Sequence, residues 1–169
     1  LVQPTAFAPN RSPEPDKRLE FQTLYRELVE DDLRNDRICD DVIDAVNGGR
    51  SPLVLTERNE HLDRLEGRLV GKIAHVVTLR AGMTKKQRRA VADRLASISP
   101  GEGRVIVATG KYIGEGFDDS RLDTLFLTLP VSWRGTITQY AGRLHRLHDG
   151  KREVRVYDYA DLNVPMLAR

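Results

Sequence analysis

Four residues near the carboxyl end of the sequence have the types and the spacing to bind phosphate. They occupy positions i, i+3, i+4 and i+7, and they are Gln139, Gly142, Arg143 and Arg146. At about 100° per residue, such positions share one face of a helix. A guanidinium group is always charged and its planar donors match phosphate oxygens, while a glycine lets a partner approach the backbone. The alternative is the ordinary solvated face of an amphipathic helix.

The helix that would carry this face is predicted over 136–148. Its opposite side is apolar and is expected to pack on a sheet, which would hold the two arginines and the amide in a fixed array. The residues of that apolar side are Ile137, Tyr140, Ala141 and Leu144.

A second candidate site is the glycine-rich loop 108–118, which follows the apolar run Arg104–Val107 without a break. Glycines permit a positive φ and bring backbone N–H groups close to a ligand. A hydroxyl and a lysine suit phosphate, and an aspartate could accept hydrogen bonds from a sugar or hold the loop. These residues are Thr109, Gly110, Lys111, Gly116 and Asp118. The alternative is an ordinary glycine-rich turn, but its place after a buried strand favours function.

Short apolar runs that alternate with amphipathic helices would position both candidates. The runs are Pro52–Leu55, Ile73–Leu79, Arg104–Val107, Thr124–Leu129 and Val154–Tyr159. Several are apolar throughout, as expected of parallel strands covered on both faces. The sequence therefore predicts an α/β fold, a parallel sheet flanked by helices with right-handed crossovers. In such sheets the working residues lie beyond the carboxyl ends of the strands.

Two helices are predicted between the first three runs. The first could be capped by Thr56, and its apolar side holds Leu62, Leu65 and Leu69. The second begins with the capping box Thr84-x-x-Gln87. Its apolar side holds Val91, Leu95 and Ile98.

The chain divides into three parts by composition. Residues 1–16 hold four of the eight prolines and are predicted to form a linker. Residues 17–49 form a helical extension, which ends at the Asn47-Gly48-Gly49 cap and turn. Residues 50–169 form the α/β domain.

The amino-acid composition and net charge are those of a soluble globular protein. Of the 169 residues, 40% are hydrophobic and 31% are charged, and the net charge is +2. The single cysteine, Cys39, excludes an internal disulfide and indicates a reducing, cytoplasmic compartment. No metal site and no membrane span are predicted, since the histidines do not converge and no apolar run approaches about 18 residues. Because the chain begins with Leu1, we expect it to be an excerpt from a longer protein.

Four segments resemble motifs of superfamily 2 helicases, in the order of that family. Val105–Asp118 is similar to motif V and Gln139–Arg146 to motif VI. Ser51–Thr56 resembles motif IV, and Leu79–Arg88 resembles motif IVa. The match covers residues 51 to about 160. It implies a RecA-like helicase C-terminal domain over 50–169, the second of two motor lobes.

Two further segments look most like motor subunits of restriction-type and related DEAD/DEAH translocases. They are Leu129–Gly135 and Arg143–His148. The stretch from Thr109 to Asp118 is one residue longer than in the DEAD-box pattern.

The resemblance implies a role for each candidate residue. Arg143 and Arg146 would act as arginine fingers on the γ-phosphate of ATP held by a preceding lobe, with Gln139 beside them. The residues expected at the nucleotide are Gly116, Asp118 and Gly142. The residues expected at the nucleic-acid backbone are Thr56, Gly82, Arg88, Thr109, Gly110 and Lys111.

The sequence also lacks the ATP-binding motifs that a complete motor would contain. It contains neither a G-x-x-x-x-G-K-[ST] loop nor a strand that ends in an Asp-Glu pair. ATP with Mg²⁺ would therefore be bound mainly by an N-terminal RecA-like lobe, and the isolated chain is predicted to be inactive. The expected partners are that lobe and nucleic acid, with DNA favoured over RNA. The alternative is a non-catalytic module that binds nucleic acid or protein, which would not need the paired arginines.

Overall fold

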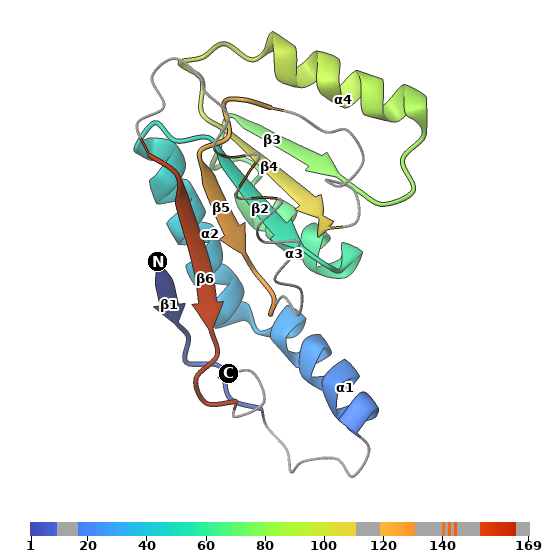
Figure 1. Ribbon diagram of the computed structural model, residues 1–169, viewed down its shortest axis with the longest axis vertical. Helices are drawn as coiled ribbons and strands as arrows, with labels where there is room; N and C mark the ends of the chain where they lie inside the picture. The colour runs from blue at the N-terminus through green and yellow to red at the C-terminus, as the bar shows by residue number, and fades with distance from the viewer. Residues whose placement is uncertain are drawn as a thin grey trace.

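Six parallel strands form one sheet in the computed structural model, in the order β1-β6-β5-β2-β4-β3 (Figure 1). The structure describes residues 1–9, 17–110, 119–130, 140, 142, 144 and 153–164. The strands are β1 (Val2–Pro4), β2 (Pro52–Thr56), β3 (His75–Leu79), β4 (Arg104–Thr109), β5 (Thr124–Leu127) and β6 (Arg155–Ala160). The helices are α1 (Lys17–Glu30), α2 (Asp32–Asn47), α3 (Asn59–Leu69) and α4 (Lys85–Ser97).

The central strands β2, β4 and β5 are buried along their whole length. Successive side chains point to opposite faces, so an uninterrupted apolar run fills two cores at once. Val54, Val107 and Phe126 belong to one core, whereas Leu55 and Ile106 belong to the other. This arrangement confirms the predicted parallel α/β fold, with strand boundaries within two residues of the predicted runs.

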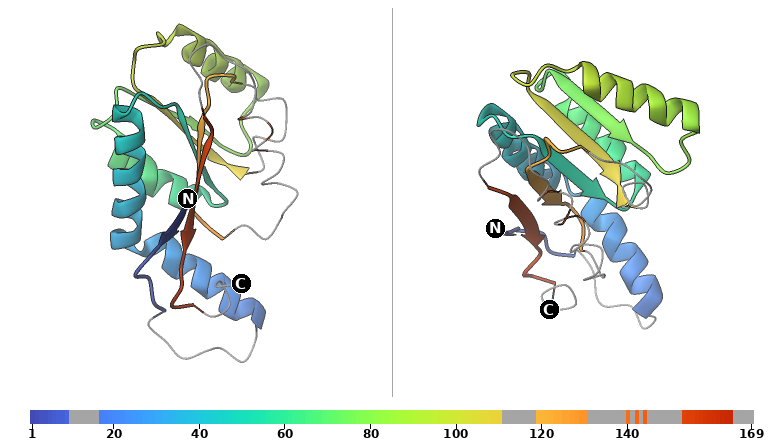
Figure 2. Two further views of the ribbon diagram at one scale, coloured as in Figure 1. Left: turned by 60° about the vertical axis from the view of Figure 1, so that its left-hand side comes forward. Right: turned by 45° about the horizontal axis from the view of Figure 1, so that its top comes forward.

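Helices cover both faces of the sheet (Figure 2). α2 and α3 pack on one face and bury the three predicted leucines of α3, which are Leu62, Leu65 and Leu69. α4 covers part of the other face through Leu95, with Ile98 just beyond its end and Val91 partly buried. Thr84 caps α4, and its hydroxyl and the Gln87 side chain form the predicted capping box.

The predicted helical extension consists of two helices that meet at Asp31. The Asp31 carboxylate accepts a hydrogen bond from the Arg34 N–H at 2.7 Å and so caps α2. α2 ends at Asn47, and Gly49 has a φ of 79°, as the predicted glycine cap requires.

α2 is not an appendage to the domain. Its buried side chains, which include Ile38, Val42 and Val46, belong to the same core as the sheet residues Val54 and Val107. The predicted boundary at residue 50 therefore runs through a continuous core. Of the two helices of the predicted extension, α1 lies beyond the carboxyl ends of β5 and β6 (Figure 1) and packs in a separate small core with Leu129 and Val164.

The predicted linker differs from the structure at its start. Val2–Pro4 forms β1, which pairs with the last strand, β6. The N–H of Thr5 continues this ladder by donating to the Ala160 carbonyl at 3.0 Å. A three-residue strand that contains a proline is tolerated here because β1 lies at the edge of the sheet.

Thr56 does not cap α3. The N-cap residue is Arg58, whose side chain makes no capping hydrogen bond. Thr56 is instead the last residue of β2, and its hydroxyl has a different role, described below.

Candidate functional site

The carboxyl edge of the sheet brings together residues that are far apart in the sequence. Thr56 ends β2 and Thr109 ends β4. Gly82 lies in the turn that follows β3, and Gly110 follows β4 directly. Because all the strands are parallel, these positions meet at one edge, where a parallel α/β sheet binds its ligands.

Half of the predicted site residues belong to the part of the chain that the structure describes. These are Thr56, Gly82, Arg88, Thr109, Gly110 and Gly142. The other predicted site residues lie outside the described residues, and they are Lys111, Gly116, Asp118, Gln139, Arg143 and Arg146. For all twelve, the predicted ligand contacts stay predictions.

The turns after β3 and β4 are joined by a hydrogen bond. The N–H of Ala81 donates to the Thr109 hydroxyl at 3.0 Å, and the Thr109 side chain is buried. Gly82, next in the chain, has a φ of 89°, which a residue with a side chain rarely adopts. The two turns predicted to contact nucleic acid therefore form one connected surface.

The turn after β4 is also joined to the helix that contains Tyr140. The Tyr140 hydroxyl donates to the Gly110 carbonyl at 2.5 Å. Tyr140 and Leu144 are buried in the core on the α4 side of the sheet, with exposed fractions of 4% and 1%. Gly142 is exposed, and an added Cβ would meet no atom within 4 Å. The helix thus buries the predicted apolar side at Tyr140 and Leu144 and presents Gly142 outward.

Thr56 faces the interior. It is 1% exposed, and its hydroxyl lies 2.9 Å from Nδ1 of His61 on α3. His61 Nε2 lies 2.8 Å from Oδ1 of Asn35, and the Asn35 amide donates to the Val29 carbonyl at 2.9 Å. Thr56 is thus buried as a whole residue, and its contact with nucleic acid stays a prediction.

These contacts define the tautomer of His61. The Val29 carbonyl oxygen can only accept a hydrogen bond, so the NH₂ group of Asn35 must face Val29. The side-chain oxygen of Asn35 must therefore face His61. Nε2 of His61 consequently carries the proton, and Nδ1 accepts from the Thr56 hydroxyl. Burial, together with the positive charges of nearby arginines, lowers the pKa of His61 to about 3. The ring is therefore neutral at physiological pH and acts as a fixed hydrogen-bonding group.

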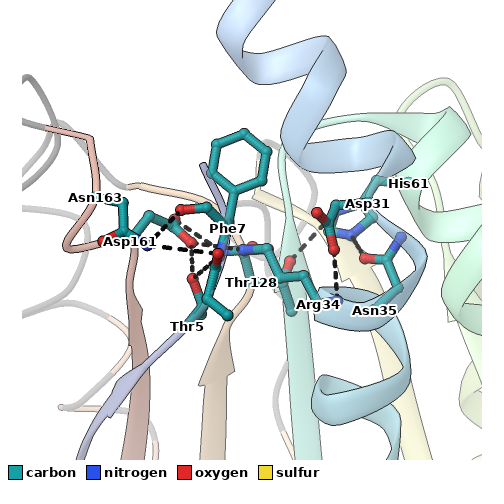
Figure 3. A network of polar contacts seen from close by, with 10 residues as sticks. Thr5, Phe7, Asp31, Arg34, Asn35, His61, Thr128, Asp161 and Asn163 are labelled. Atoms are coloured by element: carbon teal, nitrogen blue, oxygen red, sulfur yellow. Dashed lines mark hydrogen bonds and ion pairs between the residues drawn. The ribbon is translucent and has the colours of Figure 1, made fainter. Parts of the chain in front are cut away.

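A second buried network fixes the exit of β5 (Figure 3). Arg34 on α2 forms an ion pair with Asp161, Nε to Oδ1, at 2.9 Å, with side-chain exposed fractions of 1% and 0%. Another guanidinium nitrogen, Nη1, donates to the Thr128 carbonyl at 2.6 Å. Asp161 also accepts from the Thr5 hydroxyl at 2.5 Å. The network connects α2 to both ends of the chain and to the segment after β5.

That segment is held from α1 as well. The Tyr25 hydroxyl donates to the Pro130 carbonyl at 2.6 Å. Leu129 is buried in a small core with Leu24 and Leu28. Thr128–Pro130 leads toward the residues of the predicted arginine helix, so α1 and α2 position the chain where it leaves the sheet.

Arg88 and its neighbours make the start of α4 basic. Lys85, Lys86 and Arg89 are exposed, while Arg88 is partly buried and its Nε donates to the Met83 carbonyl at 3.2 Å. The Arg88 side chain is therefore held beside Met83, which directly follows Gly82.

Two residues of this edge are absent from the sequence-based site. Tyr140 is predicted only as a packing residue, and His61 only as a histidine without metal-ligand spacing. Each carries a signal that could have identified it. A tyrosine on a buried helix face has a hydroxyl that needs a hydrogen-bond partner. A histidine beside a run of buried leucines likewise has ring nitrogens that need hydrogen-bond partners.

Among the described helices, none has both the length and the apolar content needed to cross a bilayer. In the same part of the chain, no three acidic, histidine or cysteine side chains cluster so that they could hold a metal ion.

Comparison with known proteins identifies relatives of this arrangement. Residues 34–148 match the family model of the helicase conserved C-terminal domain. Over 127 residues the chain is 28% identical to transcript termination protein A18 of fowlpox virus (strain NVSL), covering 73% of this chain and 27% of that protein. The chain thus spans about a quarter of the length of this curated relative.

Solved structures share the fold. T4 UvsW superposes with a TM-score of 0.68 and 22% identity, covering 83% of this chain and 28% of that chain. The SWI2/SNF2 ATPase core domain of Sulfolobus solfataricus gives a TM-score of 0.53 and 14% identity, covering 69% of this chain and 23% of that chain. These likenesses confirm the predicted RecA-like fold. The narrower resemblance to restriction-type motor subunits stays a prediction.

Proposed function

Because the chain belongs to the family of helicase conserved C-terminal domains, we propose that it forms the second motor lobe of an ATP-dependent nucleic-acid helicase or translocase. One observation supports this role above the others. The Thr109–Gly110 turn is hydrogen-bonded both to Ala81, before Gly82, and to Tyr140, two residues before Gly142. Direct contact between the segment proposed to bind nucleic acid and the helix proposed to face the nucleotide is what a motor lobe would require.

The proposed ATP-facing group consists of Gln139, Arg143 and Arg146. Gly142 is exposed while Tyr140 is buried, which supports a helix that directs this group toward a second lobe. The two guanidinium groups would stabilise the charge that develops on the γ-phosphate during hydrolysis.

The nucleotide itself would be held mainly by the preceding lobe. This sequence has no phosphate-binding loop and no acidic pair for Mg²⁺, whose charge neutralises the phosphates when it is bound. Gly116 and Asp118 are proposed to complete the nucleotide site from this side. The buried free thiol of Cys39 accords with the reducing cytoplasm that we expect for the motor.

The proposed nucleic-acid surface consists of the turns after β2, β3 and β4 together with the start of α4. Arg88 and Lys111 would neutralise phosphates, and backbone N–H groups near Gly82 and Gly110 would approach the sugar-phosphate chain. Such contacts read no sequence. DNA is favoured over RNA as the strand that is bound.

The alternative proposal is a non-catalytic module that binds nucleic acid or protein. The presence of both Arg143 and Arg146 favours the motor, because a binding module has no use for paired arginine fingers. A phosphate-binding loop and an acidic pair in an upstream lobe of the full-length protein would decide in favour of the motor.

The first test compares the chain with the full-length protein. The purified 169-residue chain is expected to hydrolyse ATP no faster than buffer, because it lacks the loop that binds the β- and γ-phosphates. The full-length protein is expected to show turnover that nucleic acid stimulates. Phosphate release, measured with and without an oligonucleotide, checks both. Stimulated turnover by the 169-residue chain alone would overturn the two-lobe proposal.

The second test concerns nucleic-acid binding by this chain. Binding is expected to be weak and independent of sequence, with a slope of log K against log [salt] of about −1.4 to −1.8, because two basic side chains are proposed to meet phosphates. Replacing Arg88 by alanine should bring the slope about 0.7–0.9 closer to zero. Arg94→Ala, an exposed arginine in the last turn of the same helix, is the matched control and should change nothing. Fluorescence titrations at several salt concentrations provide the measurement; equal slopes for the two variants would exclude Arg88 from the surface.

A further inference from the structure

Tyr140 connects the two proposed ligand surfaces of this chain. Tyr140 is 4% exposed, and its ring packs in the core on the α4 side of the sheet. Its hydroxyl donates to the Gly110 carbonyl at 2.5 Å, across 30 residues of sequence. A buried ring with one hydroxyl at the edge of the core is held rigidly, so the bond fixes the distance between the helix and the turn.

Two hydrogen bonds hold the Thr109–Gly110 segment, and one of them comes from Tyr140. A Cβ added at Gly110 would lie 3.8 Å from the Tyr140 hydroxyl and 3.9 Å from the Thr56 carbonyl, which are ordinary contact distances, so both groups lie beside Gly110. The preceding residue, Thr109, is tied to Ala81 through its hydroxyl. A strand that binds at the Thr109–Gly110 turn therefore acts directly on the carbonyl that Tyr140 holds.

We propose that Tyr140 is a positioning residue that couples nucleic-acid binding at the Thr109–Gly110 turn to ATP binding at the helix face of Gly142. This inference rests on the proposed function and adds to it the physical connection between its two ligands. Tyr140 is buried, so it is not proposed to contact either ligand. It transmits the position of one binding surface to the other through its hydrogen bond to the Gly110 carbonyl, with its ring as the rigid part.

The coupling has a measurable consequence that a purely structural tyrosine lacks. If ATP raises the affinity for nucleic acid by some factor, nucleic acid raises the affinity for ATP by the same factor. Removing the connecting bond lowers this factor, whereas a general loss of stability lowers both affinities and leaves their ratio unchanged. The ratio is also independent of the fraction of protein that is active.

The experiment uses the full-length protein and Tyr140→Phe, which keeps the ring and removes only the hydroxyl. The Kd for a fluorescent single-stranded oligonucleotide is measured with and without a non-hydrolysable ATP analogue. We expect the ratio of the two values to fall by about three- to tenfold in the variant, the range that corresponds to one hydrogen bond of ordinary net strength. The stimulation of ATPase kcat by the oligonucleotide should fall in parallel.

Tyr159→Phe is the matched control. Tyr159 is 3% exposed, and its hydroxyl donates to the Asp41 carboxylate at 2.8 Å, on the α2 side of the sheet. The same chemical change is thus made at a buried tyrosine whose hydroxyl contacts neither Gly110 nor Thr109. The affinity ratio of this variant should equal that of the unmodified protein. Equal ratios for Tyr140→Phe and Tyr159→Phe would overturn the inference.

Hydrogen exchange provides a second measurement that needs no variant. Oligonucleotide binding without nucleotide should slow the exchange of backbone amides around Tyr140 and Leu144 in the unmodified protein. Unchanged exchange there, while amides near Thr109 become protected, would overturn the coupling. The proposed function is tested by a separate experiment, and full ATPase activity of Arg146→Ala would contradict it. Loss of turnover in Arg146→Ala together with an unaltered ratio in Tyr140→Phe would refute Tyr140 and leave the motor proposal standing.

Discussion

We expect Arg146→Ala in the full-length protein to lower the ATPase kcat by several hundred-fold or more, with almost no change in melting temperature. Arginine fingers contribute roughly 10³–10⁵ in rate where their contribution has been measured. The stability expectation follows from the helix itself, since Tyr140 and Leu144 are buried while Gly142 is exposed. In the helix predicted over 136–148, a side chain four residues after Gly142 is expected on the same outward face, and surface substitutions usually change stability by less than about 0.5 kcal/mol. Arg143→Ala should behave in the same way.

Two comparisons make this result specific. Arg146→Lys should not restore turnover, because lysine keeps the charge but lacks the planar fork of donors. Arg94→Ala, an exposed arginine on α4, should leave kcat unchanged. Steady-state phosphate release gives kcat, and a thermal melt gives the stability. If Arg146→Ala unfolds the protein while its folded fraction keeps full turnover, the arginine is structural and the motor proposal loses its main support.

The central strands of the domain were predictable because each is an apolar run that is buried along its whole length. A run such as Arg104–Val107 has one explanation in an α/β sequence, and β4 differs from it by two residues at one end. β1 was not predictable on this basis, since Val2–Pro4 is short, exposed and contains proline. What makes it a strand is its partner β6, more than 150 residues away in the sequence.

The position of the site could be predicted from the sequence, but the contacts that each side chain makes could be predicted less well. Parallel topology alone places Thr56, Gly82 and Thr109 at one edge. Sequence could not show that the Thr56 hydroxyl turns inward to His61, because that contact depends on how α3 packs. The pairing of Arg34 with Asp161 spans 127 residues and likewise follows from the fold alone.

This buried pair leads to the largest expected change in stability. We expect Arg34→Ala to lower the free energy of unfolding of the 169-residue chain by about 3–5 kcal/mol, the usual cost when one partner of a buried ion pair is removed. The Arg34 and Asp161 side chains are 1% and 0% exposed, so the truncation would leave the Asp161 carboxylate buried without its counter-charge. The Asp161 carboxylate would keep one hydrogen bond, from Thr5, and the Thr128 carbonyl would lose its donor. The corresponding fall in melting temperature is about 6–20 °C.

Arg37→Ala is the matched control for this prediction, because Arg37 lies on the same helix but is exposed, with a hydrogen bond to Gln3 at 3.1 Å. Its effect should stay within about 0.5 kcal/mol. The double variant Arg34→Met with Asp161→Leu removes both charges and should recover much of the loss, since an apolar pair of similar volume carries no desolvation cost. Urea denaturation of the four proteins, fitted with a common m-value, gives the free energies. An Arg34→Ala variant as stable as Arg37→Ala would show that the pair contributes little. A double variant no more stable than Arg34→Ala would show instead that the hydrogen bonds to Thr5 and Thr128, rather than the uncompensated charge, account for the loss.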